Sequence, residues 1–510
     1  MVGSLAKVYS AELEGIDAKL VEVEVDLNIG LHAFNIVGLA DKALSEAKER
    51  VGSAIKNAGF KPPTRENRKI TINLAPADLK KAGTQYDLAI AIGYLKATKQ
   101  IKDFDAEGKM FFGELALDGR VRRIPGGLNT AILAKELGVE ELFLPSENAK
   151  EASYVAEVGI FPVESLSSLV NHLEGTRPIA PYPTSKFHPA HSPSVNIRDV
   201  RGQAFAKRAI IVAAAGGHNI LMSGPPGSGK TMLANSIVSV LPPLDIEEAI
   251  EVSKIWSSAG VLKKSFINER PFRAPHQTAS PAAIMGGGTN PKAGEISLAH
   301  RGVLFLDELP EFRRDLLEAL RQPIESGEVV VSRASRNLTF PARFMLVAAM
   351  NPCPCGFWGD EEKECRCTAN EVFKYQKKIS GPLLDRIDIQ INVPRIKLDE
   401  LRGGVPEDNV GVHPQKQVEE TRLIQKDRFG WAGLTIKTNS EMTSKQCEEL
   451  ISITSAGKDF VKSIFDKSLL STRSYYRILK TARTIADLEK TEVVDAPHLA
   501  EAFQLRVRGE

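Results

Sequence analysis

The pattern of hydrophobic and polar positions changes along the chain, and the first region reads as mixed strand and helix. "LVEVEVDLNIGL" and "RKITINLAP" alternate apolar and polar residues, which is typical of half-buried strands. "KALSEAKERVGSAIKNAG" has helical spacing and ends in glycine, a common residue after a helix. The patterning therefore predicts a first domain with both strands and helices over residues 1–175.

A different pattern follows residues 176–195, a stretch with five prolines and little apolar periodicity that we interpret as a linker. Beyond it, apolar runs alternate with helical segments, and the runs are "HNILMSG", "GVLFLDE", "FMLVAAMN" and "IDIQINV". This alternation predicts an α/β domain with a parallel sheet covered on both faces, over residues 196–397. A second linker is expected at 398–415, before a polar, helical region at 416–510.

Composition narrows the class of protein. Hydrophobic residues make up 43% of the 510, enough for ordinary cores, and the formal net charge of +2 predicts no polyanion partner for the chain as a whole. Any polyanion site must therefore be local. The first residues lack the pattern of a secretory signal, and no apolar run reaches the ~20 residues that span a bilayer. We expect a soluble cytoplasmic protein with no membrane partner.

One motif predicts a phosphate site. "GPPGSGKT" fits G-x-x-x-x-G-K-[ST] and lies between a strand-like and a helical segment, as this motif requires. Lys230 would bridge the β- and γ-phosphates of ATP, and the Thr231 hydroxyl would hold Mg²⁺. The residues expected to bind the nucleotide are Gly224, Pro225, Pro226, Gly227, Ser228, Gly229, Lys230 and Thr231.

Polar side chains at the ends of two later apolar runs complete this site. "GVLFLDE" delivers Asp307, expected to hold Mg²⁺, and Glu308, expected to deprotonate the attacking water. "FMLVAAMN" ends in Asn351, which can hold the same water, or can simply begin a turn before Pro352. Together these residues predict a nucleoside triphosphatase.

Two arginines are candidates for stabilising the transition state. Arg386 in "GPLLDRID" would be supplied in trans, although a surface salt bridge with Asp385 or Asp388 is the alternative. Arg473, at the start of an amphipathic helix, could reach the same phosphates from a lid, with Arg477 as the fallback.

Four of the five cysteines lie in a polar insertion at 352–368, with the spacing C-x-C-x₉-C-x-C. Four thiolates suffice for a closed structural Zn²⁺ site, which would give the insertion the stability that it lacks without a core of its own. A redox disulfide pair and four unpartnered thiols remain the alternatives. The cysteines are Cys353, Cys355, Cys365 and Cys367.

Two loops are candidates for contact with DNA. "EVVVSRASRNLTFPARF" reads as a hairpin whose Arg333 and Arg336 could grip phosphates. "MGGGTNPKAGE" is a second loop, which carries Lys292. An ordinary solvated hairpin and loop are the alternative interpretation.

The phosphate motif, "LFLDE", the strand ending in asparagine, "LLDRID" and the late "STR" helix together resemble an AAA+ ATPase. "PFRAPHQTASPAAIMGGGTNPKAGEISLAHRGVLFLDELPEF" and "NPCPCG" resemble the YifB/ComM family of magnesium-chelatase-like AAA+ proteins, over nearly the whole chain. That resemblance implies a hexameric ring in which Arg386 serves the neighbour's ATP. It also implies a DNA motor that drives branch migration during uptake and recombination.

The first domain resembles the proteolytic domain of Lon, through "FFGELALDGRVRRIPGGLNTAILAKELGVEELFLPSEN". That domain uses a serine activated by a lysine. Here "KKAGTQYDLAIA" holds no serine, and Asn129 stands where the family's lysine would fall. We therefore expect this fold without proteolysis.

The sequence thus favours an ATP-driven ring motor that moves DNA, with ATP, Mg²⁺ and structural Zn²⁺ as cofactors and a helical C-terminal lid. A chelatase-type motor that drives metal insertion is the nearest rival. A nucleotide-gated scaffold is disfavoured by intact Glu308 and Asn351, and an ATP-dependent protease by the missing dyad.

Overall fold

The computed structural model describes residues 4–31, 33–38, 42–65, 67–79, 81, 83–288, 291–333, 336–396, 413–467 and 471–506. They divide into two compact units, the first made of Met1–His188 with Ile246–Ile267, the second of Pro189–Asp245 with Asn268–Glu510. The segment Ile246–Ile267, which the sequence pattern placed within 196–397, groups with the first unit. Most of the expected linker at 398–415 lies outside the described residues.

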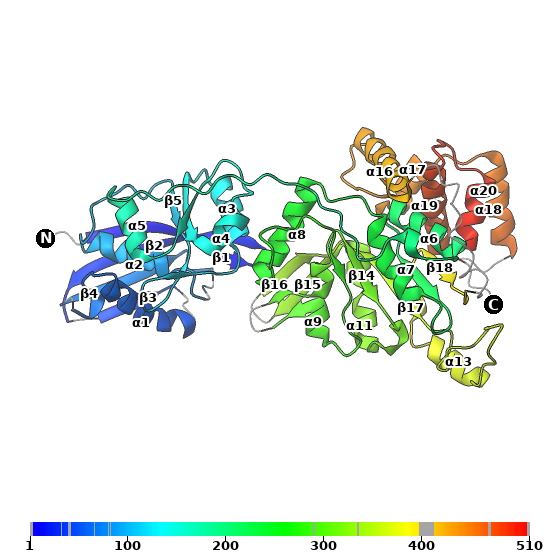
Figure 1. The fold of residues 1–510 in the computed structure, drawn as a ribbon, viewed down its shortest axis with the longest axis horizontal. Coiled ribbons are helices and arrows are strands. Elements are labelled where there is room, and N and C mark those ends of the chain that lie inside the picture. Colours follow the sequence, from blue (N-terminus) through cyan, green and yellow to red (C-terminus); the bar gives the residue numbers. More distant parts are fainter. Residues whose placement is uncertain are drawn as a thin grey trace. The chain divides into compact units, whose positions relative to one another are not determined.

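The first unit is built on a seven-stranded mixed sheet in the order β3-β4-β2-β1-β5-β8-β9 (Figure 1). The predicted alternation holds in β2, where Val21, Val23 and Val25 are buried and the residues between them are partly exposed. The strands are β1 (Ser4–Glu14), β2 (Asp17–Ile29), β3 (Ala33–Val37), β4 (Arg68–Ala75), β5 (Lys109–Phe111), β8 (Glu141–Pro145) and β9 (Gly159–Val163), with a small hairpin of β6 (Glu114–Leu115) and β7 (Val121–Arg122).

Helices of this unit pack on the sheet and on one another. The helices are α1 (Lys42–Asn57), η1 (Pro63–Arg65), α2 (Asp87–Ala97), α3 (Gly127–Glu136), α4 (Ser146–Ala152), α5 (Leu166–Leu173) and α8 (Ile246–Ala259). Helix α8 is tied into the unit by polar contacts: Lys254 Nζ lies 2.6 Å from Asp17 Oδ1, and Ser257 Oγ donates to Glu151 Oε2 at 3.1 Å.

The second unit contains a five-stranded parallel sheet in the order β11-β14-β17-β10-β18. Alternate residues of its strands enter two separate cores: Ile220 and Val347 face one, while Leu304 and Leu346 face the other. Both faces are therefore buried, which confirms the predicted fold class. The strands are β10 (Ile220–Ser223), β11 (Phe272–Arg273), β14 (Val303–Leu306), β17 (Met345–Met350) and β18 (Ile389–Asn392).

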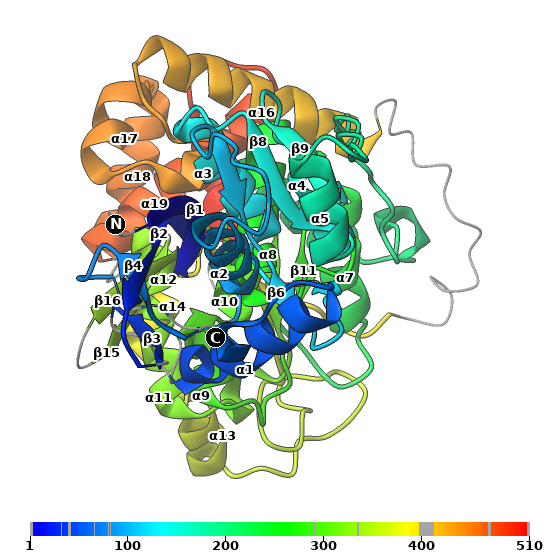
Figure 2. The same ribbon diagram turned by 90° about the vertical axis from the view of Figure 1, so that its left-hand side faces the viewer.

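Two hairpins and several short helices surround this sheet. The hairpins pair β12 (Gly286–Gly287) with β13 (Lys292–Ala293) and β15 (Glu328–Arg333) with β16 (Arg336–Pro341). The helices are η2 (Ile197–Asp199), α6 (Ala204–Gly216), α7 (Lys230–Ser236), η3 (Ile237–Ser239), α9 (Pro281–Met285), α10 (Glu295–Leu298), η4 (Leu309–Glu311), α11 (Arg314–Ala319), α12 (Arg321–Ser326), α13 (Ala369–Gln376) and α14 (Gly381–Leu384). Helix α13 lies at the lower side in both ribbon views, away from the sheet (Figures 1 and 2).

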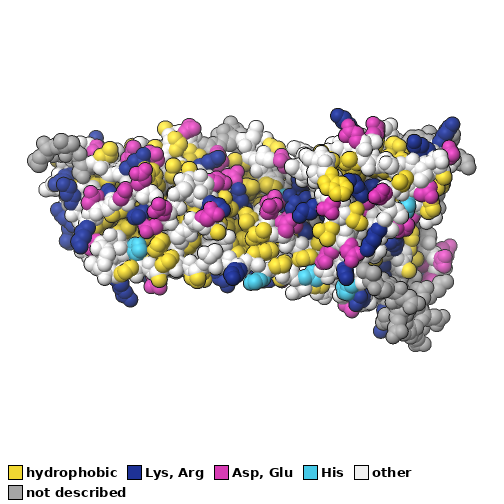
Figure 3. Space-filling model, turned by 90° about the horizontal axis from the view of Figure 1, so that it is seen from above, with side chains coloured by type: hydrophobic (Ala, Val, Ile, Leu, Met, Phe, Trp, Pro, Cys, Tyr) yellow, Lys and Arg dark blue, Asp and Glu magenta, His cyan; other side chains and the backbone are white. Residues whose placement is uncertain are grey.

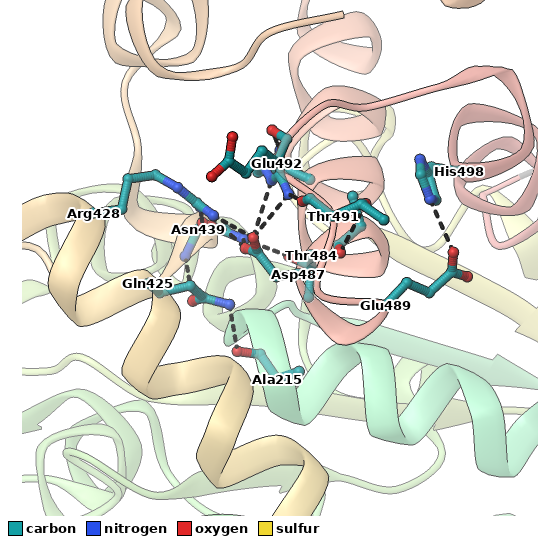
Figure 4. A network of polar contacts seen from close by, with 12 residues as sticks. Ala215, Gln425, Arg428, Asn439, Thr484, Asp487, Glu489, Thr491, Glu492 and His498 are labelled. Carbon is teal, nitrogen blue, oxygen red and sulfur yellow. Dashed lines mark hydrogen bonds and ion pairs between the residues drawn. The ribbon is translucent and has the colours of Figure 1, made fainter.

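The C-terminal helices are fixed onto α6 by buried polar contacts (Figure 4). Gln425 Nε2 donates to Ala215 O at 3.1 Å, and Arg428 and Asn439 both bind the buried Asp487 carboxylate. Such a satisfied network orients the helices rigidly. They are α16 (Pro414–Trp431), η5 (Asn439–Glu441), α17 (Ser444–Leu450), α18 (Ser455–Lys467), α19 (Thr472–Leu488) and α20 (Ala496–Gln504).

Two surface properties bear on function. Among the described residues, no helix is both long and apolar enough to cross a lipid bilayer. Acidic and basic side chains are interspersed on the face that Figure 3 shows, with no field of one sign over it. This agrees with the small net charge of the chain.

Candidate functional site

The loop between β10 and α7 carries the predicted phosphate motif at the carboxyl edge of the parallel sheet. Gly227 and Gly229 have φ of +78° and +89°, and a Cβ at either position would meet nothing within 4 Å. Glycine is therefore needed at both positions for its backbone conformation, because other residues are disfavoured in the left-handed region. At Gly224 the need is space, since a Cβ there would lie 2.2 Å from the Val393 carbonyl oxygen.

The Lys230 ammonium is buried inside this loop. Its Nζ donates to the carbonyl oxygens of Gly224 and Pro225 at 2.7 and 2.8 Å and lies 3.4 Å from Asn351 Oδ1. Burial lowers the pKa of Lys230, while the nearby Asp307 and Glu308 carboxylates oppose that shift. A poorly hydrated cation held in a glycine-rich loop is suited to bind a phosphate oxygen.

Thr231 and Asp307 meet across the sheet edge, with Thr231 Oγ1 donating to Asp307 Oδ2 at 2.9 Å. A hydroxyl and a carboxylate in contact are hard oxygen donors of the kind that Mg²⁺ takes alongside nucleotide phosphates. These residues therefore fit the predicted magnesium site. The second oxygen of Asp307, Oδ1, accepts a hydrogen bond from the backbone N–H of Glu308 at 3.0 Å.

Glu308 and Asn351 follow β14 and β17, which are neighbouring parallel strands. Glu308 adopts the left-handed conformation, with φ of +52°, which is unusual for a residue other than glycine. A cavity of 430 Å³ opens beside this pair, and its lining residues are Glu308, Glu311, Asn351, Pro354, Glu371, Lys374, Tyr375 and Lys378. A water molecule can therefore reach both the carboxylate and the amide.

Arg386 lies at the opposite edge of the sheet from these groups, where the parallel strands begin and not where they end. It precedes β18, which runs parallel to β10, and its carbonyl accepts from Asn219 Nδ2 just before β10 begins. The phosphate loop follows the other end of β10, roughly 13 Å away at 3.3 Å per strand residue. The Arg386 side chain is buried and pairs with Glu325 at 2.6 Å, rather than with Asp385 or Asp388 as the alternative supposed.

Arg473 and Arg477, both on α19, contact acidic side chains near this same edge of the sheet. Arg473 Nη2 lies 3.9 Å from Glu325 Oε1. Arg477 is bound to the buried Asp388 at 2.5 Å. Burial alone would raise the pKa of Asp388, but Arg477 and His218 outweigh burial and hold it well below its usual range. Arg477 is thus the anchor of a buried ion pair and is poorly placed as a substitute for Arg473.

The four cysteines of the insertion converge. Their sulfur atoms all lie within 4.8 Å of one another, and those of Cys353, Cys355 and Cys365 are 3.4 to 3.7 Å apart. A disulfide requires about 2.05 Å, whereas ligands at ~2.3 Å around tetrahedral zinc are about 3.8 Å apart. The spacing therefore fits a closed tetrahedral metal site. Backbone N–H groups of Phe357 and Arg366 lower the pKa of Cys355 to about 6, whereas burial raises the pKa of Cys365 to about 12.

The insertion also touches the phosphate loop. Gly356, with φ of +85°, lies so close to Pro226 that a Cβ on Gly356 would be 2.5 Å from Pro226 Cδ. Gln203, on the other side of the loop, donates to Pro394 O at 2.7 Å and lies 3.5 Å from Ser228 O. Neither contact was predicted: Gln203 belongs to no motif, and "NPCPCG", which ends in Gly356, does not specify what its glycine contacts. Only the left-handed backbone at Gly356 has a sequence signal, the glycine itself.

The two predicted DNA loops lie together. Strand β15 pairs with β16, and Arg333 opposes Arg336 at the tip, although their side chains lie outside the described set. Lys292 is exposed on β13, and a Cβ on its hairpin neighbour Gly286 would be 3.6 Å from Val331 Cγ2 of β15. The two hairpins are therefore in contact within the second unit.

In the first unit, Asn129 is buried and acts as a structural clamp. Its Nδ2 donates to Ile16 O at 2.6 Å and to Lys254 O at 3.0 Å, which joins α3 to β1–β2 and α8. A carboxamide engaged in this way offers no base for a peptidase dyad. The absence of proteolysis stays a prediction.

Three magnesium-chelatase family models match successive parts of the chain. Residues 23–148 match a family described as "Subunit ChlI of Mg-chelatase". Residues 196–401 match "Magnesium chelatase, subunit ChlI", and residues 412–506 match "Magnesium chelatase, subunit ChlI C-terminal".

Two of the relatives cover nearly the whole chain, and a third covers less than half of it. "Competence protein ComM" of Haemophilus influenzae is 43% identical, over 99% of this chain and 97% of its own. "Uncharacterized protein YifB" of Salmonella typhimurium is 39% identical, over 99% and 97%. "Magnesium-chelatase subunit ChlI" of Pyropia yezoensis is 26% identical over 41% of this chain and 59% of its own.

Proposed function

The chain belongs to the YifB/ComM family of magnesium-chelatase-like AAA+ proteins, and from that premise we propose that it is an ATP-driven ring motor acting on DNA. One observation carries the proposal of a ring. The phosphate loop and Glu308 lie at one edge of the parallel sheet, while Arg386 lies at the other edge. A single copy cannot bring both to one nucleotide, but a head-to-tail neighbour can.

The proposed reaction is hydrolysis of the terminal anhydride of ATP. Lys230 binds the β- and γ-phosphates, and Thr231 and Asp307 would hold Mg²⁺, which would neutralise negative charge on the nucleotide. Asn351 and Glu308 hold a water molecule between them, and Glu308 takes its proton as it attacks. Arg386 of the neighbouring copy stabilises the charge that spreads over the transferred phosphoryl group.

We further propose that the contacting hairpins bind DNA. Lys292, Arg333 and Arg336 place positive charge on adjacent loops of the second unit, and a phosphate backbone is attracted to such charge without regard to sequence. The relative named as a competence protein supports a role in DNA uptake and recombination, through helicase or branch-migration activity. A ring of six is what the family resemblance implies.

We propose structural zinc for the cysteine cluster. Four sulfur donors leave no open coordination position, so the metal would stabilise the insertion rather than take part in chemistry. The contact of Gly356 with Pro226 then makes the folded insertion a support for the phosphate loop.

A chelatase-type motor is the second candidate, favoured by the matches to ChlI along the chain. One experiment separates the two: ATP hydrolysis by the full chain, measured alone and with single-stranded, duplex or four-way-junction DNA. The DNA motor predicts stimulation by at least one of these, and Lys230→Ala should abolish both basal and stimulated rates. Hydrolysis that no DNA changes would refute the DNA motor and leave the chelatase-type motor or another partner.

A further inference from the structure

Two arginines from distant parts of the chain converge on one carboxylate in the second unit. Arg386 Nη2 and Arg473 Nη2 lie 2.6 and 3.9 Å from the same oxygen, Oε1 of Glu325. Arg386 stands just before β18, Arg473 is the second residue of α19, and Glu325 lies on α12. Glu325 belongs to no recognised motif and has no role in the proposed reaction.

The burial of these groups differs in an informative way. The Arg386 side chain is 6% exposed, its Nη1 donates to Pro382 O at 2.7 Å, and its Nε is buried with no hydrogen-bond partner. A buried cation of this kind needs a counter-ion. Glu325 supplies it, yet the Glu325 side chain is 45% exposed and can be reached from outside the subunit.

Arg473 is unfavourably placed for the helix that carries it. Ser471 caps α19, so Arg473 lies in the first turn, where the positive end of the helix dipole repels a cation. Further along, Arg477 fixes the helix through the buried Asp388. The helix is therefore anchored while a cation is held at its tip, beside Arg386.

We propose that Glu325 is a positioning residue that holds Arg386 and Arg473 together as a pair and presents them to the neighbouring copy's ATP. This rests on the proposed function. A carboxylate and a γ-phosphate offer guanidinium groups the same planar pair of oxygen acceptors. Glu325 thus keeps the two cations close before the nucleotide arrives, and the γ-phosphate joins or replaces it.

The first test is the kinetics of Glu325→Gln in the full chain. Without the carboxylate the guanidinium groups repel and separate, so kcat should fall at least about tenfold, part of the 10³–10⁵ that a trans arginine supplies. The KM for ATP should change less than about twofold, because the phosphate loop lies at the other sheet edge. Glu318→Gln is the matched control. Glu318 lies on the adjacent α11, is partly exposed like Glu325, and pairs with Arg321 instead of Arg386.

Subunit mixing then tests whether Glu325 acts across the interface. Glu325→Gln keeps a working phosphate loop, whereas Lys230→Ala keeps the arginine pair. When equal amounts of the two variants assemble at random, about one head-to-tail interface in four combines the intact loop with the intact pair. Mixed rings should therefore regain about a quarter of wild-type activity. Glu325→Gln mixed with Arg386→Ala should regain none, because both lack the same half. Glu325→Asp, which keeps the charge but shortens its reach, should be intermediate in kcat and guards against a folding defect.

The outcomes separate the two proposals. If Arg386→Ala mixed with Lys230→Ala stays inactive, the shared site of the proposed function is wrong, and the role of Glu325 is refuted with it. If that pair recovers activity but Glu325→Gln mixed with Lys230→Ala does not, only the role of Glu325 is refuted. An unchanged or raised kcat in Glu325→Gln would refute it as well.

Discussion

The contact between the cysteine insertion and the phosphate loop can be tested with two glycines of the same insertion. Gly356 and Gly359 have φ of +85° and +75°, so alanine at either costs about 1–2 kcal/mol of folding free energy from the backbone alone. The surroundings differ. A Cβ at Gly356 would lie 2.5 and 2.7 Å from two atoms of the Pro226 ring, whereas at Gly359 it would meet nothing within 4 Å.

Overpacking of this kind costs about 1–3 kcal/mol. If the loop yields and nucleotide binding bears the whole cost, Gly356→Ala should weaken ATP binding roughly 5- to 150-fold. Gly359→Ala should bind ATP almost as the wild type does, although it loses similar stability. Equilibrium titration with a fluorescent ATP analogue measures both, and thermal melts check the matched backbone cost. Equal ATP affinities in the two variants would show that the contact does not support the loop.

Four further predictions follow from the site. Glu308→Gln should retain ATP binding and lose turnover, and normal turnover would exclude Glu308 as the base. Protein purified under reducing conditions should contain about one zinc per chain by elemental analysis, lost when the four cysteines become serine. Replacing Arg333 and Arg336 by alanine should reduce the salt slope of DNA binding by about one per lost phosphate contact. The lowered pKa of Asp388 means that its stabilisation is full above the unfolded pKa of about 3.9 and is lost as the pH falls below it. Asp388→Asn leaves the Arg477 cation buried without its counter-ion. It should therefore lower the free energy of unfolding by about 3–5 kcal/mol at pH 7 and by much less in strong acid.

The arrangement of residues at the candidate phosphate site was predictable because its determinants are local. A glycine-rich loop between a strand and a helix, and polar residues directly after buried strands, are placed by the backbone of the parallel sheet itself. Lys230 lies beside Asn351 because β10 and β17 are neighbouring strands, whereas Thr231 reaches Asp307 from β10 past the intervening β17. The cysteine cluster was predictable for a related reason, since its spacing alone keeps the four thiols within one short insertion.

The partners of the arginines were not predictable, because they depend on packing between remote segments. Sequence proximity suggested Asp385 or Asp388 for Arg386, but the side chain turns instead toward Glu325 on α12. The grouping of Ile246–Ile267 with the first unit escaped prediction likewise, since nothing in its helical pattern reveals that Lys254 meets Asp17. Periodicity predicts that a face is buried and does not identify what buries it.

The position of Glu325 suggests how hydrolysis and movement are connected in the proposed motor. Glu325 lies near the end of α12, and only Ser326 and Gly327 separate it from β15, the first strand of the proposed DNA hairpin. The Arg343 side chain lies against Gly327, since a Cβ there would be 2.6 Å from Arg343 Cγ. A shift of α12 therefore passes to β15 through a link of only two residues. A neighbour's γ-phosphate that draws Arg386 and Arg473 from Glu325 therefore acts on the element that leads directly into the hairpin. Phosphate release would restore the original pairing, and the hairpin would move once for each ATP that the neighbouring copy consumes.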